Sequence, residues 1–311
     1  MNALVTGGAG FIGSNIVKLL LEHKYNVTVC DNLTSGNISN ISNFINNKQI
    51  KFIEIDILDK NAINNACKDI DAVFHLAASV GRQKSIDNPI EDASTNLLGT
   101  INILESMRNQ CVGKIIYSSS AAIYGELLTP IIAEDHPLNA DSPYGVTKLA
   151  GEKMILSYAS IYNIKAVCLR YFNIYGINQR FDLYGNVIPI FAKKIYSNEP
   201  ITIYGDGEQT RDFLNVRDVA NANYMAYLYD GDSDCFNLGS GYSITINDLA
   251  RIMIEISGKN TEIIYAPMRP ADVLHCKANT QKAKKFINFN PTVELIMGLK
   301  EYMNWFENNC I

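Results

Sequence analysis

The chain has 311 residues, of which 47% are hydrophobic and 19% charged, as in a globular protein with a large core. A net charge of −5 and a pI near 5.5 give no basic footprint for nucleic acid or for an anionic membrane surface. The sequence begins directly with an apolar strand, so we expect no signal peptide and no membrane span.

The seven cysteines are scattered along the chain, with no Cys-x-x-Cys motif and no cluster of histidines around them. Such a set is typical of reduced thiols in a cytoplasmic protein. We therefore expect neither a disulfide framework nor a metal site.

A glycine-rich loop follows the first expected strand, residues 3–6, and leads into a helical pattern. Gly7 permits a tight turn, Gly10 lets the backbone approach a pyrophosphate, and Gly13 lets the helix pack close to the strand. This strand–turn–helix context predicts a dinucleotide site.

The second expected strand, residues 26–30, ends in Asp31. An acid at this point binds ribose hydroxyls and repels a 2′-phosphate, which favours NAD over NADP. The polar loop 31–37 is suited to wrapping the adenosine ribose. Asp56 ends a third strand, where it could meet the adenine amino group.

The small residues of a fourth strand, 71–78, permit close approach of a cofactor. We expect His75 in this strand to be packed or hydrogen-bonded, not a catalytic base. Residues 91–109 have helical periodicity with Asn96 inside it, and a fifth strand, 113–118, leads to Ser120.

Pro143 can open a helix, which would place Tyr144 and Lys148 four residues apart on one face. A fixed ammonium beside a phenol favours the phenolate, so this pair could take a proton from an alcohol near neutral pH. On the spacing alone, a surface Tyr and Lys at an ordinary helix start is the better explanation.

A sixth strand at 166–170 completes an alternation of strands and helices, which predicts an α/β fold with a Rossmann-like, doubly wound parallel sheet. Beyond it the elements are shorter. We expect a helix at 186–195, a hairpin-like strand and turn at 201–207, and a helix at 216–229 that returns to the first domain.

These motifs together resemble the extended short-chain dehydrogenase/reductase superfamily, and within it the UDP-galactose and UDP-N-acetylglucosamine 4-epimerases. The likeness rests on residues 6–13, 31–33, 75–78, 118–120, 144–148, 170–173, 205–207 and 269–272. It implies an NAD-dependent enzyme that inverts C4 of UDP-Glc/UDP-Gal, and of UDP-GlcNAc/UDP-GalNAc, through a 4-keto sugar.

The resemblance implies that Tyr144 is the acid/base and that Lys148 holds the nicotinamide ribose and polarises Tyr144. Ser120 would hydrogen-bond the reacting oxygen, and Asn96 would support Lys148 through ordered water. The implied cofactor contacts are Gly7, Gly10, Phe11, Ile12, Asp31, Asn32, Ser35, Gly36, Asp56, Ile57, Ala77, Ala78, Asn96, Tyr144, Lys148 and Phe172.

The resemblance also implies a set of contacts to the UDP-sugar: Ser120, Asn173, Val187, Tyr204, Arg211, Arg269, Asp272 and Cys276. Asn173, Arg211 and Arg269 would bind the diphosphate, because guanidinium groups suit paired phosphate oxygens. Asp272 would meet the uridine ribose, and Tyr204 would line the uracil.

Ala121 and Ala122 follow Ser120, where the related 4,6-dehydratases carry an Asp-Glu pair and the decarboxylases a Glu at the second place. Alanine cannot move a proton, so elimination is not expected. The residue matching Cys276 borders the sugar C2 substituent in 4-epimerases. A cysteine there leaves room for N-acetyl, although Cys276 could equally be a packed residue without bearing on selectivity.

By this resemblance, residues 1–175, with a returning segment at about 212–242, bind NAD, and 176–311 mainly bind the UDP-sugar. A homodimer formed through 91–109 and 145–160 is expected. A UDP-uronate 4-epimerase or another sugar-nucleotide epimerase remains an alternative, as does an NAD-binding regulator without catalysis.

Overall fold

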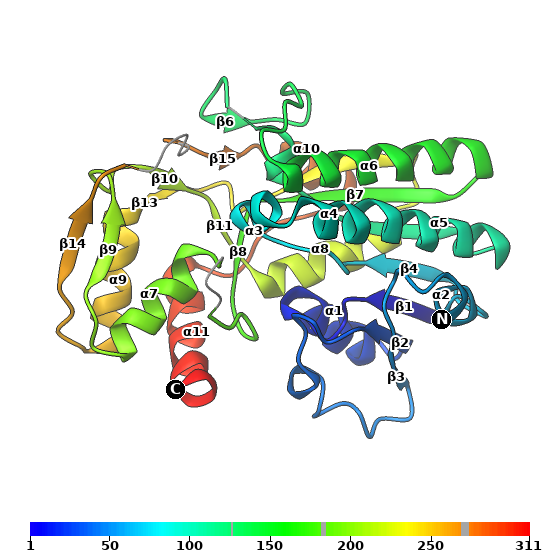
Figure 1. Ribbon diagram of the computed structural model, residues 1–311, viewed down its shortest axis with the longest axis horizontal. Coiled ribbons are helices and arrows are strands. Elements are labelled where there is room, and N and C mark those ends of the chain that lie inside the picture. Colours follow the sequence, from blue (N-terminus) through cyan, green and yellow to red (C-terminus); the bar gives the residue numbers. More distant parts are fainter. Residues whose placement is uncertain (126, 182–184, 269–273) are drawn as a thin grey trace.

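The computed structural model describes residues 1–125, 127–181, 185–268 and 274–311. A sheet of seven parallel strands lies at its centre (Figure 1). In spatial order the strands are β12 (Asp234–Leu238), β7 (Lys165–Tyr171), β5 (Lys114–Ser120), β4 (Ala72–His75), β1 (Asn2–Thr6), β2 (Asn26–Asp31) and β3 (Ile50–Glu54). The chain order reverses between β1 and β4, and this is the place where doubly wound sheets bind ligands.

Helices cover both faces of this sheet, as parallel strands joined by crossovers require. One face carries α1 (Phe11–Glu22), α8 (Val216–Leu228) and α10 (Gln281–Ile287). The other face carries α2 (Lys60–Ala66), α5 (Thr100–Asn109) and α6 (Pro143–Tyr162). The predicted Rossmann-like α/β fold is confirmed.

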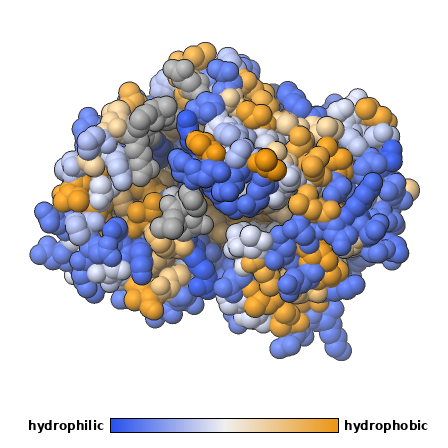
Figure 2. All heavy atoms as spheres, viewed as in Figure 1, coloured by the Kyte–Doolittle hydropathy of each residue, from blue (hydrophilic) through white to orange (hydrophobic). Residues whose placement is uncertain are grey.

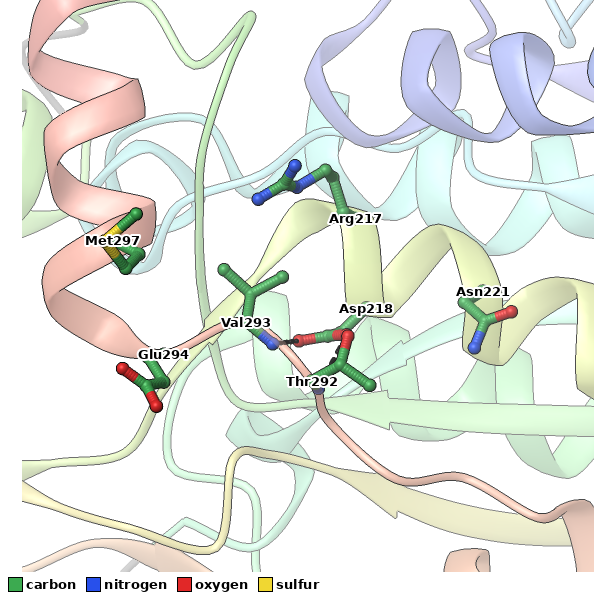
Figure 3. Close-up of a pocket in the computed structure, with 7 residues that line it drawn as sticks. All are labelled: Arg217, Asp218, Asn221, Thr292, Val293, Glu294 and Met297. Atoms are coloured by element: carbon green, nitrogen blue, oxygen red, sulfur yellow. Dashed lines mark hydrogen bonds between the residues drawn. The ribbon is translucent and has the colours of Figure 1, made fainter.

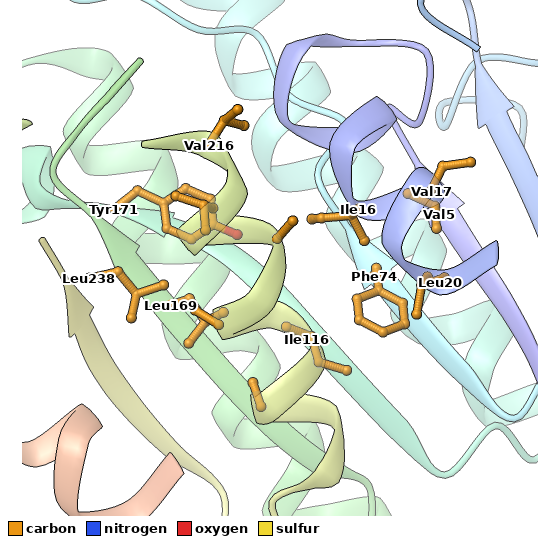
Figure 4. Close-up of a cluster of buried hydrophobic side chains, with 14 of the residues drawn as sticks. Val5, Ile16, Val17, Leu20, Phe74, Ile116, Leu169, Tyr171, Val216 and Leu238 are labelled. Atoms are coloured by element: carbon orange, nitrogen blue, oxygen red, sulfur yellow. The ribbon is translucent and has the colours of Figure 1, made fainter. Parts of the chain in front are cut away.

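The core beneath α1 and α8 follows from the alternation of side chains along each strand. Val5, Phe74 and Ile116 point to the same face and pack with Ile16 of α1 and Val216 of α8 (Figure 4). The neighbouring residue on each of these strands packs against the helices of the opposite face. Both faces are buried, which explains why the strands read as nearly continuous apolar runs.

A further apolar core lies in the C-terminal part, within α7 (Val187–Tyr196), α9 (Ile246–Ser257) and α11 (Leu295–Cys310). Four two-stranded sheets accompany it: β8 (Asn173–Tyr175) with β11 (Phe213–Asn215), β9 (Ile201–Tyr204) with β14 (Ile263–Ala266), β10 (Thr210–Arg211) with β13 (Ile244–Thr245), and β6 (Ile131–Ile132) with β15 (Lys277–Ala278). Figure 2 shows that the molecule is hollowed between this part and the larger one.

Short helical elements fill the connections near the sheet: η1 (Ile38–Asn40), α3 (Arg82–Asp87), α4 (Pro89–Ala93), η2 (Ser94–Gly99) and η3 (Ala121–Ile123). The helical periodicity predicted over 91–109 is confirmed. The helix runs without a break through α4, the π-helical turn η2 and α5. The π turn contains Asn96.

Two predictions differ from the structure. Residues 201–207 do not form a hairpin, because β9 pairs in parallel with β14, about 60 residues away. The fourth strand ends at His75 and does not continue to residue 78. The seventh strand, β12, was not predicted.

Among the described residues, no helix is both long and apolar enough to cross a membrane. All seven cysteines are free.

Candidate active site

Tyr144 lies in the first turn of α6, which begins at Pro143 as predicted. The N-cap is Ser142, whose Oγ accepts a hydrogen bond from the Gly145 amide at 3.3 Å. The amide of Tyr144 donates to Ser85 Oγ at 3.0 Å. Two hydroxyl groups therefore hold the turn that carries the predicted acid/base.

Ser120 ends β5 and meets this turn. Its Oγ accepts the Ala122 amide at 3.2 Å. Burial raises the pKa of Tyr144, the Ser120 side chain acts in the opposite direction, and the charge of Asp92 raises the pKa further. Burial is the largest of these effects, so the net shift of the Tyr144 pKa is upward, and the effect of Lys148 on Tyr144 stays a prediction.

Lys148 is almost fully buried, and its ammonium lies 4.4 Å from the centre of the Tyr117 ring. Burial lowers the pKa of Lys148 to about 7, while the charges of Asp92 and Glu152 and the neighbouring Cys168 act to raise it. Lys148 therefore changes its charge near neutral pH, which an ordinary surface lysine does not.

Asn96 joins the loop after β4 to helix α6. Its Oδ1 accepts the Ser79 amide at 2.8 Å, and its Nδ2 lies 3.1 Å from Asp92 Oδ1 and 3.2 Å from Thr147 Oγ1. Asn96 thus reaches the turn of Lys148 through Thr147. π-helical turns such as the one that carries Asn96 recur at functional sites.

Four residues around this pair were missed by sequence reasoning: Ser85, Asp92, Tyr117 and Thr147. A signal was available for one of them. Asp92 precedes Asn96 by four residues, the spacing that places two polar residues on one helix face. The contacts of the others depend on how α3, β5 and α6 pack, which no local pattern reveals.

The glycine loop leaves room for an anion at the N-terminus of α1. Gly7 has φ +67°, and a Cβ there would lie 2.8 Å from the Ala77 nitrogen. A Cβ on Gly13 would lie 2.1 Å from the Gly7 oxygen, so this close packing requires glycine. A Cβ on Gly10 would meet only the Gly7 oxygen, at 3.1 Å, so the other side of Gly10 is open. These features fit a dinucleotide pyrophosphate.

Asp31 ends β2 and closes against the glycine loop. Its Oδ2 accepts the Ala9 amide and its Oδ1 the Leu33 amide, both at 2.9 Å. Burial raises the pKa of Asp31, and these amides oppose the rise. Carboxylate oxygens accept more than one hydrogen bond, so Asp31 can also receive ribose hydroxyls.

The ends of β2 and β3 form a common rim. Asn32 Nδ2 donates to Asp56 Oδ2 at 2.8 Å. Ile57 packs against Gly99, because a Cβ added to Gly99 would lie 2.4 Å from Cδ1 of Ile57. The other predicted cofactor residues are Phe11, Ile12, Gly36, Ala77 and Ala78, all partly buried, Ser35, exposed, and Phe172, buried.

Among the predicted substrate residues, the structure brings Asn173, Arg211 and Cys276 together around Asp212. The amide and the Nδ2 of Asn173 donate to the Asp212 carbonyl at 3.3 and 3.2 Å. Burial raises the pKa of Cys276 to about 11, and the charge of the neighbouring Arg211 opposes this rise.

Val187 and Tyr204 belong to the smaller part of the molecule. Val187 is the first residue of α7, and Tyr204, 36% exposed, is the last residue of β9. The predicted positions Arg269 and Asp272 lie outside the described residues.

The buried carboxylate of Asp212 joins three segments. Its Oδ1 accepts the amide and the hydroxyl of Ser240, at 2.7 and 2.6 Å. Its Oδ2 accepts the Gly241 and Ala278 amides, at 3.1 and 3.0 Å. The strand that carries Arg211 is thereby fixed to the loop after β12 and to β15, next to Cys276.

A separate hollow of about 500 Å³ lies between α8 and the start of α11 (Figure 3). Asp218 at its wall accepts the amide and hydroxyl of Thr292 and the amide of Val293. These bonds satisfy Asp218 within the fold, so we assign this hollow no chemistry.

With this geometry in view, comparison with known proteins identifies the family. Residues 3–239 match the model of the NAD dependent epimerase/dehydratase family. The chain belongs to this family. It is therefore an enzyme of the family with NAD as its cofactor, and the open glycine loop fits that group.

Solved structures of this family match the whole chain. A UDP-glucose 4-epimerase of Thermotoga maritima, solved with UDP-glucose, is 37% identical with a TM-score of 0.94, covering 100% of both chains. A UDP-N-acetylglucosamine 4-epimerase of Methanobrevibacter ruminantium, in complex with UDP-N-acetylmuramic acid, is 35% identical with a TM-score of 0.94, covering 99% of this chain and 98% of that one. A UDP-glucuronic acid 4-epimerase of Bacillus cereus, with UDP-glucuronic acid and NAD, is 32% identical with a TM-score of 0.92, covering 99% of both.

Proposed function

We propose that this family member is a UDP-hexose 4-epimerase that works through a 4-keto sugar. The observation that carries the proposal is that Ser120, at the end of β5, meets the first turn of α6, where Tyr144 lies one helical turn before the buried Lys148. This set can deprotonate and reprotonate one alcohol.

The residues of the chain would act as follows. Tyr144 takes the proton of the sugar 4-hydroxyl and later returns it to the 4-oxygen, while Ser120 hydrogen-bonds that oxygen. Lys148, in its charged form, favours the phenolate of Tyr144. Bound NAD supplies reversible hydride transfer at C4. The keto sugar must turn between the two transfers, so UDP is the part that the protein has to hold firmly.

The residues after Ser120 support epimerisation over elimination. Ala121 and Ala122 form the turn η3 directly behind the serine, and neither side chain can exchange a proton. Tyr144 therefore has no second acid or base at these two positions to act on C5 or C6.

For the nucleotide, we propose that Asn173, Arg211, Arg269 and Asp272 hold UDP and that Tyr204 and Val187 line its site. This places UDP mainly in 176–311, with NAD in 1–175 and the returning segment 212–242. The juxtaposition of Asn173, Arg211 and Cys276 around Asp212 supports this division.

For the sugar, we propose that Cys276 leaves room beside C2, so that UDP-GlcNAc/UDP-GalNAc react as well as UDP-Glc/UDP-Gal. Cys276 is a small side chain, 9% exposed, packed with Phe172 and Ala278. The variant Cys276→Tyr is expected to lose UDP-GlcNAc turnover and to keep UDP-Glc turnover. Equal loss on both sugars contradicts this assignment and makes Cys276 a packing residue.

The activity is tested by incubating the purified protein with UDP-Glc, UDP-GlcNAc and UDP-glucuronate and following C4 inversion by NMR. We expect inversion of the first two. Inversion of UDP-glucuronate alone supports the second candidate, a UDP-uronate 4-epimerase, which the Bacillus cereus relative favours.

Tyr144→Phe separates the epimerase from an NAD-binding regulator. Turnover is expected to fall at least ~100-fold, because the acid/base is removed. The control, Tyr158→Phe, lies on the same helix and loses only a bond to Glu105 of 2.7 Å, so its turnover is expected to stay near wild type. Equal turnover in Tyr144→Phe and wild type contradicts the mechanism.

We also propose a homodimer formed through α5 and α6. These helices pack together, and α6 leaves Ile161 66% and Tyr162 40% exposed, an apolar pair that a second copy could cover. Light scattering is expected to give twice 34.6 kDa. A mass of one chain contradicts this proposal.

A further inference from the structure

Asp92 is a buried carboxyl group that the proposed chemistry does not use. It lies in α4, is 1% exposed, and faces the first turns of α6. Its Oδ2 accepts the Thr147 hydroxyl at 2.5 Å, and its Oδ1 accepts Nδ2 of Asn96 at 3.1 Å. A carboxylate withdrawn from water in this way is costly unless it has partners.

The residue that Asp92 binds lies inside the predicted catalytic turn. Thr147 directly precedes Lys148 and follows Tyr144 by three positions. Asn96, held on the π-helical turn η2, donates to Thr147 Oγ1 at 3.2 Å. Asp92, Asn96 and Thr147 therefore form a closed triangle behind the face that carries Tyr144 and Lys148.

The charges around Asp92 come from two helices. Lys84 of α3, which also pairs with Glu91 at 3.2 Å, and Lys148 of α6 both lower the pKa of Asp92, although burial raises it more strongly. The groups that face Lys148 from the elements around it are Asp92 of α4, Tyr144 and Glu152 of α6, Cys168 of β7, Tyr117 of β5 and His75 of β4.

We propose that Asp92 is a positioning residue: through its hydrogen bond to Thr147 it fixes the turn that carries Tyr144 and Lys148, and it places a carboxylate beside that turn. The kinetic part of this proposal rests on the proposed epimerase function. The effect on the charge of Lys148 is independent of that function.

The direction of the effect follows from the charges. The negative charge of Asp92 raises the pKa of Lys148, so its removal lowers that pKa below the present value of about 7. Lys148 then loses its proton at a lower pH and ceases to favour the phenolate of Tyr144. The alkaline side of the kcat profile therefore moves to lower pH. A residue with only a structural role leaves its position unchanged.

The test compares Asp92→Asn with Asp92→Glu and with Asp218→Asn. Asp218 is the matched control, because it is also buried and also ties a helix to a neighbouring segment, in this case α8 to Thr292 at the hollow of Figure 3. The titration midpoint of Lys148 is measured by NMR on protein labelled at the lysine Cε. The Lys148 signal is assigned by its absence in Lys148→Met. In Asp92→Asn the midpoint is expected to fall by about one pH unit, while Asp92→Glu and Asp218→Asn keep the wild-type midpoint.

Activity gives the second readout. On the UDP-sugar that the wild type inverts, kcat of Asp92→Asn is expected to fall about tenfold on the alkaline side and much less on the acid side. An unchanged Lys148 midpoint and an unchanged kcat profile overturn the proposal. A shifted midpoint in a wild type that inverts no UDP-sugar contradicts the proposed function but not the role of Asp92.

Thr147→Val separates position from charge, since Asp92 keeps its charge while its hydrogen bond to α6 is lost. The expected result is a lower kcat with an unchanged Lys148 midpoint. If Asp92→Asn does not fold, this variant decides the positioning role alone, and an unchanged kcat in Thr147→Val overturns it.

Discussion

His75 is held without charge at the centre of the sheet. Burial lowers the pKa of His75 to about 3, and the charge of Lys148 adds to this effect. Its two ring nitrogens lie 2.7 Å from Thr6 Oγ1 and 3.0 Å from Thr100 Oγ1. These contacts join β1, β4 and α5, and they confirm that His75 is a hydrogen-bonded strand-end residue.

This neutral histidine makes stability depend on pH. Between about pH 6.5 and pH 3 the unfolded chain binds a proton at His75 that the folded chain does not, so the free energy of unfolding falls as pH falls. From pH 7.5 to 5.5 the loss from this residue is expected to be ~1.4 kcal/mol. Urea unfolding at both pH values measures it.

The variant His75→Gln is expected to lose less stability than wild type over the same interval, because a glutamine takes up no proton. His23→Gln serves as the control. Its ring stacks on Tyr224 at the surface and not within the sheet. An identical pH dependence in His75→Gln and wild type contradicts the account.

At the scale of elements, a buried ion pair joins α6 to β5 and β7. Arg170 approaches both carboxylate oxygens of Glu152, at 2.7 and 3.1 Å, and the Ser119 hydroxyl donates to Glu152 at 2.8 Å. Burial acts to raise the pKa of Glu152, but the hydrogen bond and charge of Arg170 outweigh it and lower the pKa. The pair fixes the middle of the helix that carries Lys148.

Glu152→Gln is expected to lower the free energy of unfolding by ~3–5 kcal/mol at pH 7, because Arg170 stays buried without its partner. The pKa of Glu152 is depressed in the folded state, so the contribution is present above the unfolded pKa of about 4.3 and is lost as pH falls. The difference between variant and wild type should therefore shrink in acid. Urea unfolding at pH 7 and pH 4 measures both effects.

The control for this variant is Arg251→Gln, which breaks an exposed pair with Asp248 of 3.4 Å and is expected to cost under ~1 kcal/mol. A loss of similar size in Glu152→Gln would show that the buried pair does not hold α6.

How far the sequence predicts these elements depends on whether their partners are local. The helix start at Pro143, the turn at Gly7 and the close packing at Gly13 are local, and the structure confirms them. The partner of β9 is β14, far along the chain, so the strand pattern of residues 201–204 could not identify it. The triangle around Asp92 escaped for the same reason, because it forms only when α4 packs on α6.

At the scale of the whole molecule, the two parts share one polar centre. Asp212 follows Arg211 in the chain. Its single carboxylate accepts hydrogen bonds from both the Ser240 segment and the Ala278 segment. The motif around Arg211 could be recognised from the sequence. The anchoring role of its neighbour Asp212 could not, because all the groups that Asp212 binds are at least 28 residues away.

This shared anchor has a consequence for local opening. The amides of Ser240, Gly241 and Ala278 all end on one carboxylate, so a fluctuation that frees one of them exposes the others. In native-state hydrogen exchange we expect these three amides to exchange as one unit, with a single opening free energy. Asp212→Asn should speed all three together, whereas widely different protection factors would show that the segments open separately. The segments around Asp212 then behave as one cooperative unit, so a ligand that orders one of them protects all three amides.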